Sequence, residues 1–283
     1  MWAHCLFVQN IVEQGLIFSF IITALYLTSR VIKFDDLTIE GSFGIGGALT
    51  TWCLINGWHW STAFVAALMG GACTGLITGL LNTRLGLNNL ISGIVTTTGL
   101  FSINLVIAGA HAALGTIPTI FSRVPSMHWI VLVPLTALLL ITVRWLLTTE
   151  IGFLFTAIGD NPHMLTNLGK SASTVKIAVL MLANAITAFG GSLYVQHFGY
   201  FSIWANVGIL IVGFAGLILA EAFGKGFGIS IVIGGLLYQA IIALTFECEI
   251  DQSWNKLITA LLIVFLIVIK NTVQFRGSKE KSC

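Results

Sequence analysis

The chain has 283 residues, of which 57% are apolar and only 8% are charged, and its formal net charge is +2 at pH 7. A soluble globular domain carries about 25% charged residues, so too few charges are present here to cover a water-facing surface. The composition excludes a soluble protein and gives no sign of a nucleic-acid partner. It indicates an all-α polytopic membrane protein whose surroundings are the lipid bilayer.

Apolar runs predict about nine (8–10) transmembrane helices in a single transmembrane domain over residues 1–283, because a helix needs about 20 apolar residues to cross the hydrocarbon. In chain order the runs cover residues 9–30, 38–56, 60–82, 89–110, 127–147, 173–196, 203–223, 227–246 and 254–270. The second run opens with Thr38, Glu40 and Ser42 and continues as "GSFGIGG". This pattern predicts a broken or re-entrant helix, which is tolerated where protein or a watery cavity surrounds it.

The basic residues predict the orientation of the chain, because Lys and Arg in short loops favour the cytoplasmic side. With the C-terminus in the cytoplasm, nine alternating spans place all 13 Lys and Arg residues inside except Arg123 and Lys256. The same alternation places the N-terminus outside, and an even number of spans would reverse that end alone. Most of the histidines then fall near the outer ends of the spans.

The polar stretch "TAIGDNPHMLTNLGKSAS", residues 156–173, falls on the cytoplasmic side and carries the signals of a short helix. Asn161 fits the N-cap, Pro162 the first helical position and Gly169 the left-handed position after the helix. Asp160 adds negative charge at the positive end of the helix dipole. A helix of about two turns is unstable alone in water, so it must lie against something.

Two interpretations of this short helix stay open. It is either an ordinary structured loop that rests on its own protein or on the bilayer, or a docking element for a soluble partner. Met164, Leu165 and Leu168 would form a small apolar face suited to a groove on such a partner.

Three stretches resemble ABC importer permeases of the branched-chain amino acid and ribose type, over about residues 34–271. The first is the cytoplasmic coupling segment with the span after it, matched by Ala157, Gly159, Asn161, Gly169 and Lys176. The second, "FDDLTIEGSFGIGGALT", is similar to the family's start of the second span. The third, "LISGIVTTTGLFSINLVIAG", is similar to the fourth-span segment in an amino-acid-associated branch of the family.

The resemblance implies a permease subunit of the bacterial cytoplasmic (inner) membrane. Such a subunit is driven by ATP hydrolysis in another polypeptide. The chain itself has no G-x-x-x-x-G-K-[ST] nucleotide motif, so the ATPase must be a separate cytoplasmic ABC subunit. The family also implies a periplasmic or lipid-anchored substrate-binding protein and a second permease copy, either identical or a paralogue. One departure is the bulky segment Leu165–Leu168, where the family carries small residues.

Polar residues inside apolar spans are candidates for the substrate path. We expect Glu40, Thr97, Asn104, Asn184 and Asn206 to line it, although the hydrogen bonds that Ser, Thr and Asn form between helices explain such residues equally well. The solute would be small and polar, an amino acid first, with a sugar or nucleoside left open.

No catalytic constellation, cofactor motif or metal-ligand spacing is present in the sequence. An enzyme is therefore not expected. The alternative to the importer is a stand-alone secondary transporter or channel, which would usually carry charged residues at the middle of its spans for ion coupling.

Overall fold

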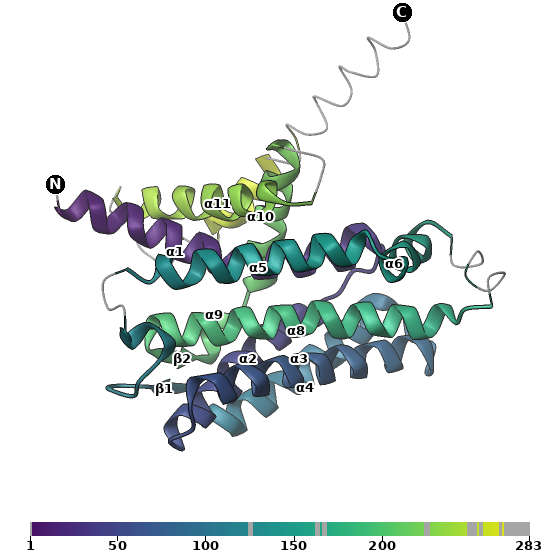
Figure 1. Ribbon diagram of the computed structural model, residues 1–283, viewed down its shortest axis with the longest axis horizontal. Coiled ribbons are helices and arrows are strands. Elements are labelled where there is room, and N and C mark those ends of the chain that lie inside the picture. Colours follow the sequence, from purple (N-terminus) through teal and green to yellow (C-terminus); the bar gives the residue numbers. More distant parts are fainter. Residues whose placement is uncertain are drawn as a thin grey trace, which may run out of the picture.

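The computed structural model describes residues 2–123, 127–161, 165, 169–223, 227–247, 254, 257–265 and 268. Helices dominate these residues (Figure 1). In chain order the elements are α1 (Trp2–Leu25), the π-helical turn η1 (Tyr26–Val31), α2 (Thr38–Ile55), α3 (Trp60–Thr83), α4 (Asn89–Ala108), β1 (His111–Ala113), the 3-10 turn η2 (Ile120–Arg123), α5 (Trp129–Leu147), α6 (Glu150–Asp160), α8 (Ala172–Phe198), β2 (Tyr200–Ser202), α9 (Ile203–Asn206), α10 (Ile209–Phe223) and α11 (Ile229–Glu247).

Six helical segments in the described part of the chain are long and apolar enough to cross a membrane. They are Phe7–Val31, Trp60–Thr83, Asn89–Ala108, Trp129–Leu147, Ala172–Phe198 and Ile203–Phe223. The apolar part of α11, Ile229–Thr245, is shorter, and α2 is not among the six. The last expected run, 254–270, is described only at residues 254, 257–265 and 268. The all-α polytopic class is confirmed, whereas the count of about nine spans is not.

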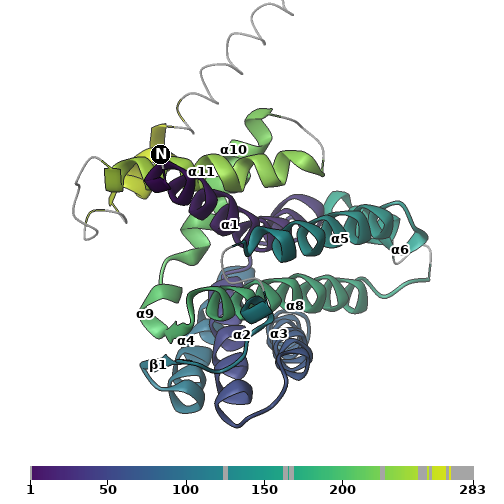
Figure 2. The ribbon, with the colours of Figure 1, turned by 60° about the vertical axis from the view of Figure 1, so that its left-hand side comes forward.

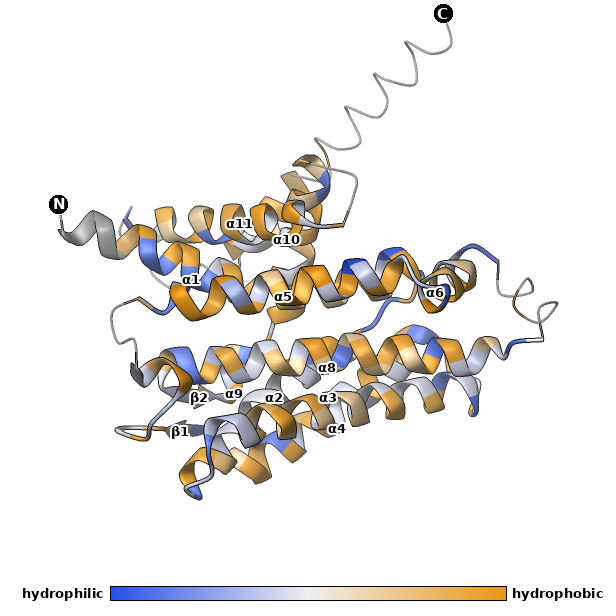
Figure 3. Ribbon diagram, in the orientation of Figure 1, coloured by the Kyte–Doolittle hydropathy of each residue, from blue (hydrophilic) through white to orange (hydrophobic). Residues whose placement is uncertain are grey.

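The helix α8 lies at the centre of one group of helices and packs most extensively against α3 and α2, with α4 covering α2. The helix α1 joins this group to a second one, since it packs against α11, α8, α5 and α10 (Figure 2). Hydrophobic residues follow the lengths of these helices (Figure 3). At one end, β1 and β2 pair antiparallel, with His111 opposite Ser202 and Ala113 opposite Tyr200.

The helix α2 runs without interruption from Thr38 to Ile55, so the expectation of a broken or re-entrant second helix is wrong. Its glycines allow close packing instead. A Cβ added at Gly46 would lie 1.9 Å from the carbonyl oxygen of Ala188 on α8. On α3, a Cβ added at Gly75 would lie 2.2 Å from the carbonyl oxygen of Leu180. Small residues thus bring the α8 backbone into direct contact with both neighbours, as is common between helices in lipid.

The interruption falls in a different span, between α9 and α10. Val207 leaves the helix with φ −67° and ψ 116°, and Gly208 follows with φ +92°. Glycine adopts this backbone conformation without the steric cost that a Cβ brings. The span expected over residues 203–223 therefore consists of a single turn, a break and a longer helix.

We expect Gly46→Ala to destabilise the protein by about 2 kcal/mol or more, because the new methyl group overlaps a backbone oxygen that cannot turn away. Thermal unfolding of the purified protein in detergent measures this loss. The matched control is Gly99→Ala on α4, where an added Cβ meets no atom within 4 Å. This control should leave stability unchanged or raise it by about 1 kcal/mol, and a similar loss in both variants would refute the packing argument.

Candidate substrate path and coupling segment

A buried polar network joins the start of α2 to the middle of α8. The Asp36 carboxylate accepts hydrogen bonds from the Thr38 backbone N–H at 2.9 Å and from Asn184 Nδ2 at 2.8 Å. The other side of the Asn184 amide, Oδ1, accepts from the Ser42 hydroxyl at 2.6 Å. Burial raises the pKa of the Asp36 carboxyl, while the hydrogen bonds from Thr38 and Asn184 lower it. Asn184 is thus engaged on both sides of its amide and fastens α8 to the connection before α2.

Four of the five residues expected in the substrate path line one small cavity between α2, α4 and α9. Glu40 comes from the first turn of α2, Thr97 and Asn104 come from α4, and Asn206 comes from α9. Gly41, Phe101, Ile203 and Val207 complete the lining. The cavity measures about 30 Å³, which holds about two water molecules. Asn184 is placed elsewhere, within the network described above.

Two buried amides at this cavity carry polar atoms that the described residues leave without a hydrogen-bond partner. These atoms are Oδ1 of Asn104 and Nδ2 of Asn206. A Cβ added at Gly44 would lie 2.4 Å from Asn104 Nδ2 and 3.2 Å from Asn206 Nδ2, so both amides meet over this glycine of α2. A buried polar atom without a partner costs about 1–3 kcal/mol. One acceptor and one donor without a partner therefore belong to two residues that line the same small cavity.

The remaining polar groups of the lining are held in defined positions. The Thr97 hydroxyl donates to the backbone oxygen of Leu37 at 2.8 Å, which ties α4 to the connection before α2. Glu40 is half-buried in the first turn of α2, where the helix dipole favours a negative charge. The cavity therefore combines an acidic group with amide and hydroxyl groups.

A second, larger cavity of about 340 Å³ lies beside the break between α9 and α10. Its lining includes Tyr194, Tyr200, Tyr238 and Gln239, and Val207 belongs to both cavities. This volume falls within the range of small-molecule pockets. The sequence does not reveal this cavity, because its lining residues, from Gln14 to Thr259, come from segments that are far apart in the chain.

The first part of the predicted coupling segment differs from the sequence expectation. Ala157, Gly159 and Asp160 lie in the last turn of α6, and Asn161 is the C-terminal cap of that helix, its N–H donating to the Ala157 oxygen at 2.9 Å. The expectation placed these residues before a helix and Asn161 at its N-cap; residues 162–164, where that helix would begin, lie outside the described residues. The difference arises because Thr149 and Glu150 begin a separate helix that was not recognised, and its apolar face packs on the core.

The helix α6 is fastened to the connection between α1 and α2. A Cβ added at Gly159 would lie 2.0 Å from the carbonyl oxygen of Val31, at the end of η1. On the exposed side, Lys33 Nζ pairs with Asp160 Oδ1 at 2.9 Å. The close backbone contact is the firmer of the two links, because exposed ion pairs contribute little to stability.

The end of the segment follows the sequence expectation at Gly169 but not at Leu165. Gly169 has φ +69°, and the Lys170 N–H donates to the Leu165 oxygen at 2.9 Å, which is the bond that closes a helix with a left-handed residue. Leu165 is fully buried in the main core of this chain, so it does not belong to an apolar face presented to a partner. Pro162, Met164 and Leu168 lie outside the described residues.

Comparisons with known proteins agree on one family. The family model described as the branched-chain amino acid transport system permease component matches residues 7–267. The chain is 29% identical over 268 residues to the tyrosine transport system permease protein of Clostridioides difficile (strain R20291), covering 93% of this chain and 90% of that protein. It is 28% identical over 212 residues to an uncharacterized protein of Rickettsia prowazekii (strain Madrid E), covering 74% and 75% of the two chains. No solved structure matches.

We expect Asn184→Ala to lower the free energy of unfolding by about 1–3 kcal/mol, because the buried Asp36 carboxylate and Ser42 hydroxyl each lose a partner. Thermal unfolding in detergent measures this change. The control is Asn56→Ala, whose exposed side chain donates only to the Trp52 oxygen and whose replacement should cost within about 0.5 kcal/mol. Equal stability of the two variants would contradict the structural role of Asn184.

Proposed function

The chain belongs to the permease family of branched-chain amino acid transport systems, and we propose on that premise that it is the membrane-spanning subunit of an ATP-driven amino acid importer. In this proposal the chain works with a cytoplasmic ABC ATPase, a periplasmic or lipid-anchored substrate-binding protein and a second permease copy. It lies in the bacterial cytoplasmic membrane with its C-terminus in the cytoplasm.

The observation that carries the proposal is the pair of partnerless amide atoms on Asn104 and Asn206. Water in the cavity can supply the missing partners, and we propose that a polar solute takes the place of this water during transport. An amino acid carries a carboxylate, which accepts hydrogen bonds, and an ammonium group, which donates them. The free Asn206 N–H group suits the carboxylate, and the free Asn104 oxygen with the nearby Glu40 suits the ammonium group.

The size of the cavity favours a conformational cycle over a permanently open channel. At about 30 Å³ the space admits water but not an amino acid, so passage requires the surrounding helices to separate. The break between α9 and α10 is the place in the lining where the backbone is interrupted, and such discontinuous helices are common at transporter binding sites. An external supply of energy fits this requirement. The tyrosine transport name of one relative supports an amino acid as the solute.

The proposed coupling element is the segment from Asn161 to Gly169 together with the end of α6. Its support is the resemblance in sequence, the left-handed turn at Gly169 and the close contact between Gly159 and Val31. In this proposal the ATPase presses on the segment when it closes around ATP, and α6 transmits the displacement to the connection that leads into α2.

We expect Asn104→Leu and Asn206→Leu to lower ATP-driven uptake by about tenfold or more, since a hydrogen bond to a charged group contributes about 1.5–3 kcal/mol. Unfolding temperatures should change little, because each change removes a partnerless buried atom, while Asn104→Leu also removes the 3.4 Å hydrogen bond from Asn104 Nδ2 to the Gly41 oxygen. Uptake of a panel of radiolabelled amino acids that includes tyrosine is measured in proteoliposomes with the ATPase and binding protein.

The control for these variants is Thr98→Val, which lies on the exposed side of α4 and should leave uptake unchanged. Unchanged uptake in both asparagine variants would refute the substrate path. Equal uptake in proteoliposomes that lack the ATPase would establish the secondary transporter or channel instead.

We expect Gly169→Ala to reduce the ATP hydrolysis that the permease stimulates, because a left-handed conformation costs an alanine about 1–2 kcal/mol and displaces the coupling segment. Binding of the solute to the permease should not change. The control is Gly86→Ala, which has a similar φ of +67° and open space around it but lies in the turn after α3. If both variants lowered hydrolysis equally, the segment would have no special role in coupling.

A further inference from the structure

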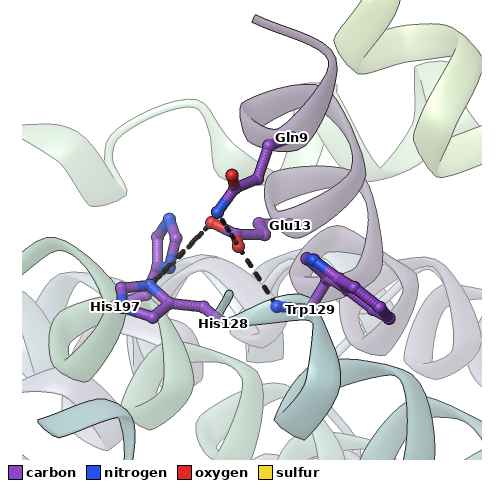
Figure 4. A network of polar contacts seen from close by, with 5 residues as sticks. All are labelled: Gln9, Glu13, His128, Trp129 and His197. Atoms are coloured by element: carbon purple, nitrogen blue, oxygen red, sulfur yellow. Dashed lines mark hydrogen bonds and ion pairs between the residues drawn. The ribbon is translucent and has the colours of Figure 1, made fainter. Parts of the chain in front are cut away.

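Two histidines and a glutamate that are far apart in the sequence meet where α1, α5 and α8 come together (Figure 4). Glu13 lies on α1, His128 is the residue immediately before α5, and His197 lies in the last turn of α8. These residues take no part in the proposed substrate path or coupling segment. The Glu13 side chain is 3% exposed and that of His197 is 7% exposed, whereas that of His128 is 20% exposed. The cluster is therefore nearly closed but reachable past His128.

The three groups direct ligand atoms toward a common point. His128 Nδ1 and His197 Nδ1 are 3.0 Å apart, and Glu13 Oε2 lies 3.8 Å from each of them. A zinc ion with ligand bonds of about 2.0–2.1 Å sets its tetrahedral ligands about 3.4 Å apart. The observed distances of 3.0 and 3.8 Å lie on either side of this value. Each ligand atom would therefore need to move by only a few tenths of an ångström to bind an ion.

Surrounding groups hold the carboxylate in the orientation that this geometry needs. Glu13 Oε1 accepts hydrogen bonds from Gln9 Nε2 at 2.9 Å and from the Trp129 backbone N–H at 3.1 Å. Its second oxygen, Oε2, is thereby turned toward the two histidines, as Figure 4 shows. The Phe121 ring packs against the imidazole of His128, with ring centroids 4.7 Å apart. Fixed ligands of this kind raise the affinity of a metal site.

We propose that Glu13, His128 and His197 bind a divalent transition metal ion, with zinc the best match to two imidazoles and one carboxylate. The ion supplies the positive charge that a buried carboxylate requires. It links the middle of α1 to the start of α5 and the last turn of α8. The distribution of basic residues assigns this end of the helices to the outer side of the membrane, so the ion enters from outside the cell.

The test uses the full-length protein, purified in detergent with an affinity tag that contains no histidine. After dialysis against zinc, elemental analysis should find about one zinc ion per chain in the wild-type protein. Cobalt should give the visible absorption bands of a tetrahedral site, and zinc should raise the unfolding temperature of the wild-type protein. This stabilisation needs no variant and remains informative if a substitution impairs folding.

The variants His197→Ala and Glu13→Gln should bind zinc at least tenfold more weakly and lose both the cobalt bands and the stabilisation. The matched control is His111→Ala on β1, an exposed histidine outside the cluster, which should behave as the wild type does. Absence of zinc from the wild-type protein would overturn the proposal. Undiminished zinc binding in His197→Ala would overturn it as well, because the ion would then lie at another site.

Discussion

The contact between the backbones of α2 and α8 is the constraint on which most of the remaining structure depends. Lipid provides no hydrophobic force that would drive apolar helices together, so close packing and hydrogen bonds must hold them. At Gly46 the two helices touch without an intervening side chain. This contact fixes the rotation of α2, which places Ser42 beside Asn184 and Gly44 beneath Asn104 and Asn206. The cavity and the buried network are both consequences of that one orientation.

Polar residues within the helices have two separate roles, which their partners distinguish. Asp36, Ser42 and Asn184 satisfy one another and hold the helices together. Asn104 and Asn206 retain a free acceptor and a free donor at the cavity. The hydrogen bonds of the first set stabilise the fold, whereas the partnerless atoms of the second set lower its stability. Asparagine occurs in both sets, so the residue type alone does not reveal the role.

Hydropathy was sufficient to predict the class of protein and the position of most helices, because the cost of burying polar groups in lipid is read directly from local composition. It was insufficient for the second helix, where "GSFGIGG" suggested a break and the glycines instead accommodate the backbone of α8. The true break at Gly208 has one glycine and no polar run, so it left no local signal. Whether a glycine interrupts a helix or permits contact depends on its neighbour in space.

The candidate site was predictable in part for the same reason. Glu40, Thr97, Asn104 and Asn206 were expected in the substrate path from polarity alone, and the fold brings these four together. Asn184 is equally polar, but hydrogen bonds with Asp36 and Ser42 use both sides of its amide. The helix α6, which Asn161 caps at its C-terminal end, was not predicted. Glu13, His128 and His197 form no recognisable metal-ligand motif in the sequence, because they come from three distant parts of the chain.

The contact between Gly159 and the Val31 oxygen joins α6 directly to the last residue of η1. No side chain separates the two backbones, so a displacement of α6 would act directly on the six-residue connection 32–37. That connection carries Asp36, whose carboxylate is bonded to α8, and it ends at the first residue of α2. A displacement of α6 would therefore reach the start of α2, the helix that contributes Glu40 and Gly41 to the cavity.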